Sequence, residues 1–395
     1  MKVLYCNPSF WDYRLPYFTC LNKLFGSFSV IYSTKRYCGR EKLLEQIPKT
    51  LGKHAIPYEN EPMFDITTRS FSKFTENGKQ IPMPFGLLSQ IRKQKPDILR
   101  TEGFFQWTPW VLLYSLFHHT PVFMGYERTL WTERNTGKLK TWHRKLTDKF
   151  ITGYLVNGVE TQSYLQSIGI KKEKIIITGM SADGSGLRAG IKAMTDEEKK
   201  DMIAKYKTNK GIMYLFCGAL IKRKGVEPML AAWIEHIKKH PKDTLVLIGG
   251  GELHDKIISM YANEYSIFIE GRKEYQDVCK YYGIADVFIL PTIEDNWSLV
   301  VPEAMSCGLP IATSIYNGCY PELVQEGKNG CTFDTFNQKS LLSALDYFHH
   351  IDLKEFGKKS KEIEKEYSTE KCAMREYEGI KKLLENKINN GLFIK

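Results

Sequence analysis

Short apolar, β-branched runs alternate with helix-length segments along most of this chain, and the alternation occurs twice. The first series comprises residues 2–6, 28–33, 97–101, 121–126, 154–158 and 175–179. The second series comprises residues 211–218, 244–250, 266–271, 287–291 and 310–314. Strands of this composition, separated by helical crossovers, predict parallel sheets that are covered on both faces. The sequence therefore predicts an α/β chain with two doubly wound, Rossmann-like domains.

The boundary between the two series is small, polar and rich in glycine. Residues 181–186 read Ser-Ala-Asp-Gly-Ser-Gly, which predicts a linker near residues 180–190. We assign residues 1–185 to an N-terminal domain and residues 186–370 to a C-terminal domain, each long enough to bury its own core. Residues 371–395 form a charged helical tail that could return to the N-terminal domain.

Several simple sequence patterns restrict the cellular compartment and the class of protein that we expect. The nine cysteines include no C-x-x-C pair, unlike a disulfide framework or a zinc site, so we expect a reducing, cytoplasmic compartment. Residues 1–10 lack the pattern of a secretory signal peptide. The most apolar window, residues 110–117, is much shorter than the roughly 20 residues that span a bilayer. The first strand is not followed by G-x-G-x-x-G, which argues against a nicotinamide-dependent dehydrogenase.

The net charge of +11 lies entirely in the first domain. Residues 1–185 contain 26 basic residues (Lys and Arg) and 15 acidic residues (Asp and Glu). Residues 186–395 contain 30 basic and 30 acidic residues. This excess favours an anionic ligand or an anionic membrane surface, such as the inner face of the cell membrane. Because no recognition motif accompanies the charge, we expect no nucleic acid as a partner. Four aromatic residues near the basic clusters are candidates for shallow membrane insertion or for core packing: Phe104, Phe105, Trp107 and Trp110.

Residues 294–314 carry the strongest chemical signal. Asp295 and Glu303 lie eight residues apart, with Leu299 and Val300 between them near the start of an expected helix. A loop acid and a helix acid in this arrangement can hold the hydroxyl groups of a ligand, while free helix N–H groups face its phosphate. The alternative is a pair of surface carboxylates that flank a packed helix.

This segment resembles the motif of two acids separated by seven residues in the retaining family 4 glycosyltransferases of the GT-B fold. Asp295 takes the first acid position, Ser298 replaces the usual Gly, and residues 303–310 (EAMSCGLP) follow the rest of the motif closely. Residues 315–330 look like the family's next segment, and the likeness covers residues 210–370 nearly throughout. The resemblance implies two Rossmann-like domains that face each other across a cleft.

The same resemblance implies a donor site in the C-terminal domain. The family places a lysine and an arginine against the donor diphosphate, and here these are Lys224 and Arg223, with Ala219 at a usually basic position. By the same resemblance, Glu303 would hold the ribose hydroxyls and Asp295 the hydroxyls of the donor sugar. Glycine after the next strand would let a ligand approach the backbone closely. The other donor-side residues that the family implies are Gly249, Gly251, Arg272, Leu299 and Val300.

The N-terminal domain matches the family less well. Residues 7–18 look like the Y-R-x-P-x-F opening of some bacterial members, but they lack the Gly-Gly loop that others use near the donor. The family's usual active-site His has no clear counterpart, and Glu127 stands at the corresponding strand end. The candidate catalytic residues are therefore Asp295, Glu303 and Glu127.

Taken with the resemblance, the sequence indicates a hexosyltransferase of the kind used in polysaccharide biosynthesis. It would transfer sugar from a UDP- or GDP-sugar to a glycan, lipid-linked or other acceptor, with retention of anomeric configuration. No Asp-x-Asp occurs, so we expect no metal and no cofactor, and Lys, Arg and a helix N-terminus would meet the diphosphate charge. Two alternatives stay open: a sugar-nucleotide epimerase of the same architecture, and a catalytically silent protein that binds sugar nucleotides.

Overall fold

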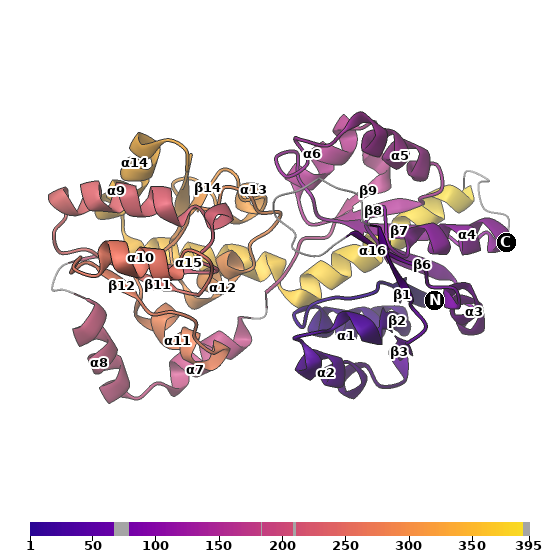
Figure 1. Cartoon of the computed structure of the whole chain (residues 1–395), viewed down its shortest axis with the longest axis horizontal. Helices are drawn as coiled ribbons and strands as arrows, with labels where there is room; N and C mark the ends of the chain where they lie inside the picture. The colour runs from indigo at the N-terminus through magenta and orange to yellow at the C-terminus, as the bar shows by residue number, and fades with distance from the viewer. Residues whose placement is uncertain (67–78, 183, 208–210, 390–395) are drawn as a thin grey trace.

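A computed structural model describes residues 1–66, 79–182, 184–207 and 211–389, which form two α/β domains, each built on a parallel sheet (Figure 1). The first sheet has the order β3 (Ala55–Tyr58), β2 (Ser27–Ser33), β1 (Lys2–Cys6), β6 (Ile98–Glu102), β7 (Val122–Tyr126), β8 (Gly153–Val156) and β9 (Ile175–Ile177). In its centre, Val3 of β1 lies between Phe28 of β2 and Ile98 of β6 in register. Both faces of this sheet are buried, because separate apolar cores lie on its two sides.

Helices cover both faces of the first sheet. The two cores divide these helices between the faces, because one core includes α3, α4 and α6 and the other includes α1, α2 and α16. The helices of this domain are α1 (Arg14–Phe25), α2 (Glu41–Leu51), α3 (Leu87–Gln94), α4 (Thr108–His118), α5 (Lys138–Asp148) and α6 (Val159–Ser167). No helix among the described residues is long and apolar enough to cross a membrane.

The second sheet is also parallel and lies in one extensive apolar core. Its order is β12 (Ile267–Ile269), β11 (Thr244–Ile248), β10 (Met213–Cys217), β13 (Val287–Leu290), β14 (Ile311–Ser314) and β15 (Gly330–Phe333). Its helices are α7 (Ser185–Ala193), α8 (Asp196–Tyr206), α9 (Val226–Lys239), α10 (His254–Tyr261), α11 (Tyr275–Ile284), α12 (Val300–Cys307), α13 (Tyr320–Leu323), α14 (Gln338–Tyr347) and α15 (Leu353–Glu364). The predicted pair of doubly wound α/β domains is confirmed.

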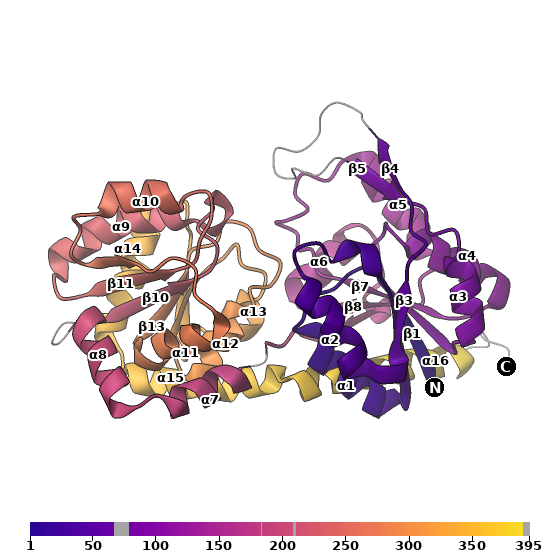
Figure 2. The ribbon, with the colours of Figure 1, turned by 60° about the horizontal axis from the view of Figure 1, so that its bottom comes forward.

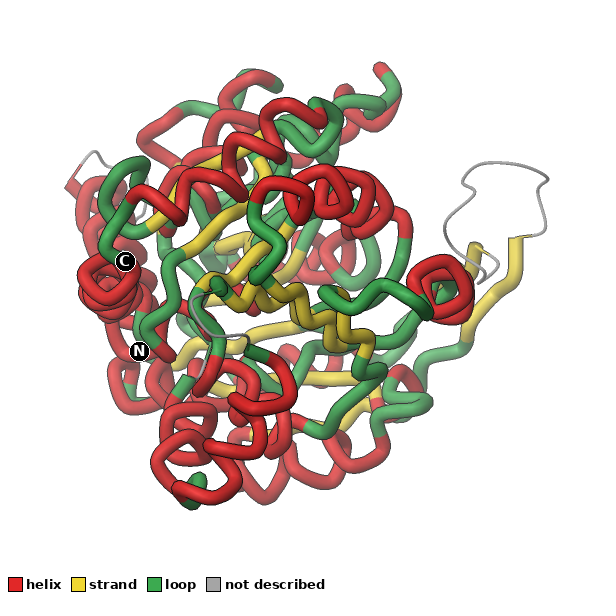
Figure 3. The backbone as a smooth tube through the Cα atoms, turned by 90° about the vertical axis from the view of Figure 1, so that its left-hand side faces the viewer, coloured by secondary structure: helices red, strands yellow, loops and turns green. Residues whose placement is uncertain are grey.

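Four strands were not expected from the sequence. Two are the edge strands β3 and β15. The other two, β4 (Met63–Ile66) and β5 (Lys79–Pro82), form an antiparallel pair beside the first domain. Figures 2 and 3 show this pair projecting from the body of the molecule. The residues between β4 and β5 lie outside the described part of the chain.

The expected linker near residues 180–190 is shorter than the composition suggested. Ser185 already begins α7, which packs against α11 of the C-terminal domain and buries Leu187 in the second core. Residues 185–190, most of them small, are therefore helical, because Leu187 among them packs into the core of the C-terminal domain. Asp183, inside the predicted linker, lies outside the described residues.

The last described helix, α16 (Thr369–Asn389), leaves the C-terminal domain and runs along the N-terminal one (Figure 2). It packs against α1 and contacts β8 and β9. Glu376 of α16 is buried, pairs with Arg100 at 3.2 Å and accepts a hydrogen bond from the Tyr17 hydroxyl at 2.6 Å. Where the chain crosses between the domains, the Ser181 and Thr369 hydroxyls lie 3.0 Å apart, so the two crossings are bonded to each other.

We expect Ile380→Ala to destabilise the N-terminal domain by about 2 to 5 kcal/mol, because the buried side chain would leave a cavity. Lys382→Ala, on the exposed face of the same helix, is the matched control and should change stability by less than about 0.5 kcal/mol. Chemical denaturation of both variants measures the difference. Equal stabilities would show that α16 does not belong to the core of the N-terminal domain.

Candidate active site

The two domains meet at the loop between β7 and α5. The Trp131 indole N–H donates to the carbonyl oxygen of Ile293 at 2.7 Å, and the Trp131 ring packs on the Tyr316 ring with centroids 4.4 Å apart. Arg134 of the same loop forms an ion pair with Glu294 at 2.9 Å. Ile293 and Glu294 directly precede the acid motif, so this junction brings the loops after β7 and β13 together.

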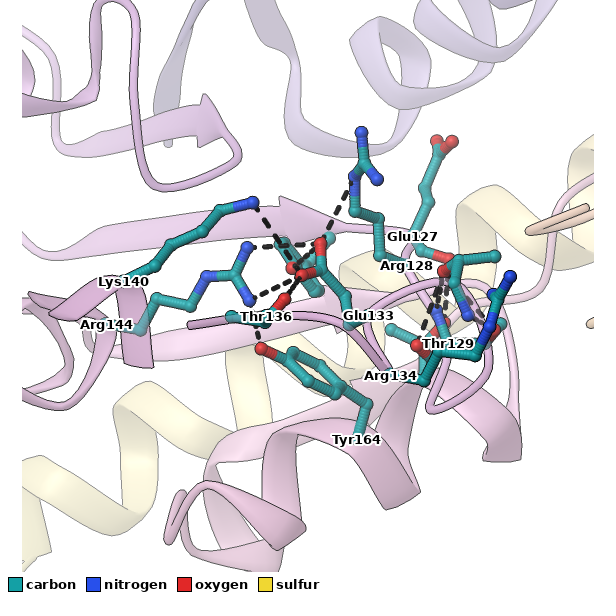
Figure 4. Close-up of polar contacts among 12 residues, drawn as sticks. Glu127, Arg128, Thr129, Glu133, Arg134, Thr136, Lys140, Arg144 and Tyr164 are labelled. Carbon is teal, nitrogen blue, oxygen red and sulfur yellow. Dashed lines mark hydrogen bonds and ion pairs between the residues drawn. The ribbon is translucent and has the colours of Figure 1, made fainter. Parts of the chain in front are cut away.

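A buried carboxylate anchors the β7–α5 loop on the N-terminal side (Figure 4). Glu133 accepts hydrogen bonds from the Arg144 guanidinium at 2.9 and 3.1 Å. Arg128 Nε and Lys140 Nζ lie 3.3 and 3.8 Å from the same carboxylate. Burial is the largest single effect on the pKa of Glu133 and would raise it, but the hydrogen bonds from Arg144 and Thr136 and the charges of Arg144 and Lys140 together lower it. The carboxylate is therefore ionised and holds the loop that carries Glu127.

The loop after β10 presents the basic residues expected at the donor diphosphate. Within a short 3-10 turn, Lys224 forms an ion pair with Asp295, and both side chains are only 13% exposed. Arg223 lies 3.6 Å from the Asp295 carboxylate and donates to the carbonyl oxygen of Glu294 at 2.6 Å. Burial is the largest single effect on the pKa of Asp295 and would raise it, but the charge and hydrogen bond of Lys224, with smaller effects of Ser298 and Arg223, together lower it. In this structure the lysine and the acid of the two motifs are paired with each other.

The helix α12 carries the second acid of the motif. Leu299 and Val300 are partly exposed at its start, where the first N–H groups of a helix have no partner within it. Glu303 follows in the first turn, and the Tyr282 hydroxyl donates to its carboxylate at 3.5 Å. Burial raises the pKa of Glu303 to about 7, and the charge of Asp12 in the N-terminal domain adds a smaller increase. Glu303 therefore lies close enough to the other domain to interact with it electrostatically.

Two glycines after β11 allow close packing between neighbouring loops. Gly249 and Gly251 both have positive φ angles, of 146° and 153°. A Cβ on Gly249 would lie 1.8 Å from the carbonyl oxygen of Gly218, and one on Gly251 would lie 2.6 Å from that of Leu220. These glycines therefore let the loop after β11 pack against the backbone of the loop after β10, which is the loop that leads to Lys224. Arg272 is exposed and forms no ion pair within the described part of the chain.

Glu127 lies at the junction on the N-terminal side. Its carboxylate forms an ion pair with Arg14 in the first turn of α1, and its carbonyl oxygen accepts a hydrogen bond from the Thr161 hydroxyl at 2.9 Å. Burial raises the pKa of Glu127, Arg14 opposes this effect, and the charge of Asp295 raises the pKa further. The structure therefore places Glu127 near the acid motif of the other domain.

Sequence analysis missed polar residues at the ends of β1 and β6. The Tyr5 hydroxyl donates to Glu102 at 2.8 Å, and the Asn7 amide donates to the Tyr5 oxygen at 2.7 Å. Arg14 lies within the Y-R-x-P-x-F segment but received no role. The available signal was that Asn7 follows the apolar strand β1 and Glu102 ends β6, at the sheet edge where parallel sheets collect functional groups.

One histidine cluster lies away from this junction. Ligand atoms of His236, Asp243 and His349 lie within 4.8 Å of one another, which makes the group a candidate for holding a metal ion. The two histidines already hydrogen-bond the Asp243 carboxylate, at 2.8 and 2.7 Å. The cluster lies at the end of α9 and the start of β11, whereas the acid motif follows the carboxyl end of β13. It therefore does not belong to the candidate donor site.

The comparison with protein families agrees with this geometry. Residues 197–367 match the family described as glycosyl transferases group 1 and therefore form a domain of that class. Among solved structures, Anabaena Alr3699/HepE in complex with UDP has the same fold, with a TM-score of 0.73 and 14% identity over 97% of this chain and 100% of that one. The GT-B fold implied by the resemblance is confirmed.

Two relatives show how far the sequence similarity extends. An uncharacterized glycosyltransferase of Methanocaldococcus jannaschii is 30% identical over 209 residues, which cover 49% of this chain and 57% of that protein. The alpha-monoglucosyldiacylglycerol synthase of Acholeplasma laidlawii is 30% identical over 130 residues, or 32% of each protein. The chain thus matches about half, or less, of the length of these relatives.

The raised pKa of Glu303 predicts a pH-dependent stability. Because the folded protein holds this proton more tightly than the unfolded chain does, the parent should lose stability relative to Glu303→Gln as pH rises from 4.5 to 7. The full difference corresponds to at most about 3 kcal/mol. Urea unfolding of both proteins at mildly acidic and mildly alkaline pH measures it. A constant difference between them would mean that Glu303 is ionised at acidic pH like an ordinary glutamate.

Proposed function

We propose that this protein is a retaining glycosyltransferase that transfers sugar from a nucleotide-sugar donor to an acceptor. The observation that carries the proposal is the pairing of Lys224 and Arg223 with Asp295, in the loop that leads to the helix carrying Glu303. The group 1 glycosyltransferase domain supports it, and so does the similarity of fold to a protein solved with UDP. The donor would be a UDP- or GDP-sugar.

Each of these residues has a role in donor binding. Lys224 and Arg223 would bind the diphosphate, and each charge-assisted hydrogen bond contributes about 1.5 to 3 kcal/mol. The free N–H groups at Leu299 and Val300 would add a positive helix end to the same phosphates. Once the diphosphate takes Lys224, the Asp295 carboxylate is released to accept hydrogen bonds from hydroxyl groups of the donor sugar.

Glu303 would bind the two ribose hydroxyls. Burial is the largest effect on its pKa, which it raises to about 7. Two hydroxyl groups that donate to the carboxylate stabilise its charged form and lower the pKa. Donor binding should therefore release a proton from Glu303 near neutral pH.

On the acceptor side, Glu127 and Arg14 form an ion pair, and the charge of Asp295 in the acid motif acts on Glu127. Glu127 would accept a hydrogen bond from the acceptor hydroxyl, and Arg14 would hold the carboxylate in position. The leaving diphosphate oxygen would take the acceptor proton, so this proposal needs no covalent intermediate. A glycan or a lipid-linked acceptor fits, and the relative from Acholeplasma laidlawii carries diacylglycerol in its name.

The two alternative functions differ in their products. An epimerase would isomerise the donor without releasing nucleotide, and a silent protein would bind the donor without changing it. The exposed Ala219 removes one expected positive charge, but Arg223 is exposed a few residues further along the same loop. Incubation of the protein with UDP- and GDP-sugars and candidate acceptors, followed by nucleotide and sugar analysis, separates the three functions.

We expect Lys224→Ala to weaken binding of the nucleoside diphosphate by about 1.5 to 3 kcal/mol, because a charge-assisted contact is lost. Binding of the nucleoside without phosphates should change little. Lys222→Ala, an exposed lysine in the same turn, is the matched control and should bind UDP or GDP like the parent. Titration calorimetry measures both variants. Equal affinities of parent and Lys224→Ala would exclude Lys224 from the diphosphate site.

For the acids, we expect Glu303→Gln to reduce turnover at least tenfold, because Gln keeps the helix but loses the charge. Asp295→Asn should lower kcat more than it weakens nucleotide binding, because its partner is the transferred sugar. Steady-state kinetics with the identified donor, together with calorimetry, separates these effects. A change in KM alone for Asp295→Asn would contradict its role at the sugar.

A further inference from the structure

The helix α5 presents its apolar stripe to solvent and its polar face to the domain. Leu139, Trp142 and Leu146 follow the helical spacing of one face, and Leu139 and Trp142 are 79% and 61% exposed. The buried side chains of this helix are Arg144 and Thr147. A surface helix of a globular protein normally has the reverse arrangement. The inward face is polar because Arg144 pairs with the buried Glu133, as Figure 4 shows.

The neighbouring helix α4 continues the same apolar surface. Leu113, Leu116 and Phe117 are exposed on it, Phe117 by 76%, and Phe150 is exposed just after α5. A shallow groove separates the two helices, and its apolar lining includes Leu112, Leu113, Leu116, Leu146 and Phe150. Contiguous apolar surface of this kind on a soluble domain marks an interaction site. We call these residues of α4 and α5 the α4–α5 surface.

The aromatic residues that the sequence marked for insertion are not the ones that form this surface. Phe104 and Trp107 are buried in the core of the N-terminal domain, and Trp110 is partly buried. Phe105 is exposed, and its ring stacks on that of His143 in α5.

Positive charge surrounds the α4–α5 surface. Lys138, Lys145 and Lys149 are exposed on and just after α5, and the sequence of α4 contains no acidic residue. The acid of α5, Asp148, is paired with Lys174. An apolar stripe that is bordered by lysines is the pattern of helices that lie in the interface of an anionic membrane.

We propose that the α4–α5 surface docks the protein on a lipid bilayer that carries anionic headgroups. The apolar side chains enter the boundary between headgroups and acyl chains, and the lysines contact lipid phosphates. A second copy of this chain fits the surface less well, because a symmetric contact would set these lysines against one another.

The docking surface is connected to the candidate active site by a single loop. The β7–α5 loop carries Glu127, contacts the C-terminal domain through Trp131 and Arg134, and leads directly into α5. An acceptor held in the membrane would therefore be presented beside the junction. This last step rests on the proposed function, whereas docking itself does not.

Cosedimentation of the full chain with vesicles tests the proposal. We expect binding to phosphatidylcholine vesicles that contain phosphatidylglycerol, weaker binding as salt rises, and much weaker binding to pure phosphatidylcholine. Leu139→Ser/Trp142→Ser should lower the partition coefficient at least tenfold, because two exposed apolar side chains no longer enter the bilayer. Lys145→Ser/Lys149→Ser should lower it about thirtyfold. All four side chains are exposed, so the fold should be retained.

Two matched control variants replace exposed residues of the same two kinds, apolar and lysine, by serine on the C-terminal domain. Met260→Ser/Tyr265→Ser removes exposed apolar side chains, and Lys192→Ser/Lys199→Ser removes exposed lysines. Both controls should bind vesicles like the parent. Absence of parental binding to anionic vesicles, or an equal loss in the controls, would overturn the proposal. So would a dimer that dissociates in the Leu139→Ser/Trp142→Ser variant while vesicle binding is absent.

Donor binding and nucleotide release, measured in parallel without vesicles, distinguish this proposal from the proposed function. The α4–α5 variants should bind UDP or GDP like the parent, because their side chains lie outside the donor site. Vesicle binding without any nucleotide release would support the docking surface and contradict the transferase. Nucleotide release without vesicle binding would support the transferase and overturn the docking surface.

Discussion

The ion pair between Lys224 and Asp295 joins the two loops on which the candidate donor site depends. Lys224 ends the loop after β10, and Asp295 lies in the loop after β13. Removal of either partner would leave the other as a largely buried charge without this ion pair, which is destabilising. Gly249 and Gly251 pack a third loop against the first. Contacts within the protein itself therefore hold the three loops together. Under the proposed function, a bound diphosphate would replace the Asp295 carboxylate as the partner of Lys224. The same exchange would make Asp295 available to the hydroxyl groups of the donor sugar.

The sequence was sufficient for the two sheets because parallel strands buried on both faces are continuous apolar runs. It was insufficient at the edges, where strands are short and tolerate residues that interrupt the pattern. β3 contains Pro57 and β15 begins with Gly330, both of which weaken a strand prediction. Composition also gave a wrong prediction at α7, because its small residues suggested a linker. The helix forms because Leu187 packs into the core of the folded C-terminal domain.

The candidate site, like the fold, could be predicted from the sequence only in part. The family resemblance pointed to Asp295, Glu303, Arg223 and Lys224, but it did not reveal that Lys224 and Asp295 are paired with each other. Arg144 lies in a stretch, residues 138–145, that contains four lysines and arginines, yet it is buried against Glu133. A single sequence does not distinguish a cation that neutralises an inner carboxylate from one that faces water. The outward apolar stripe of α5 follows from that buried pair, so it could be recognised only in three dimensions.

The double crossing between the domains has a mechanical consequence. The chain passes from one domain to the other after β9 and returns before α16, and the Ser181 and Thr369 hydroxyls join the two passages at 3.0 Å. Each passage limits how far one domain can turn against the other, and two passages side by side limit it more than one would. A displacement of either domain would therefore act on both passages at once.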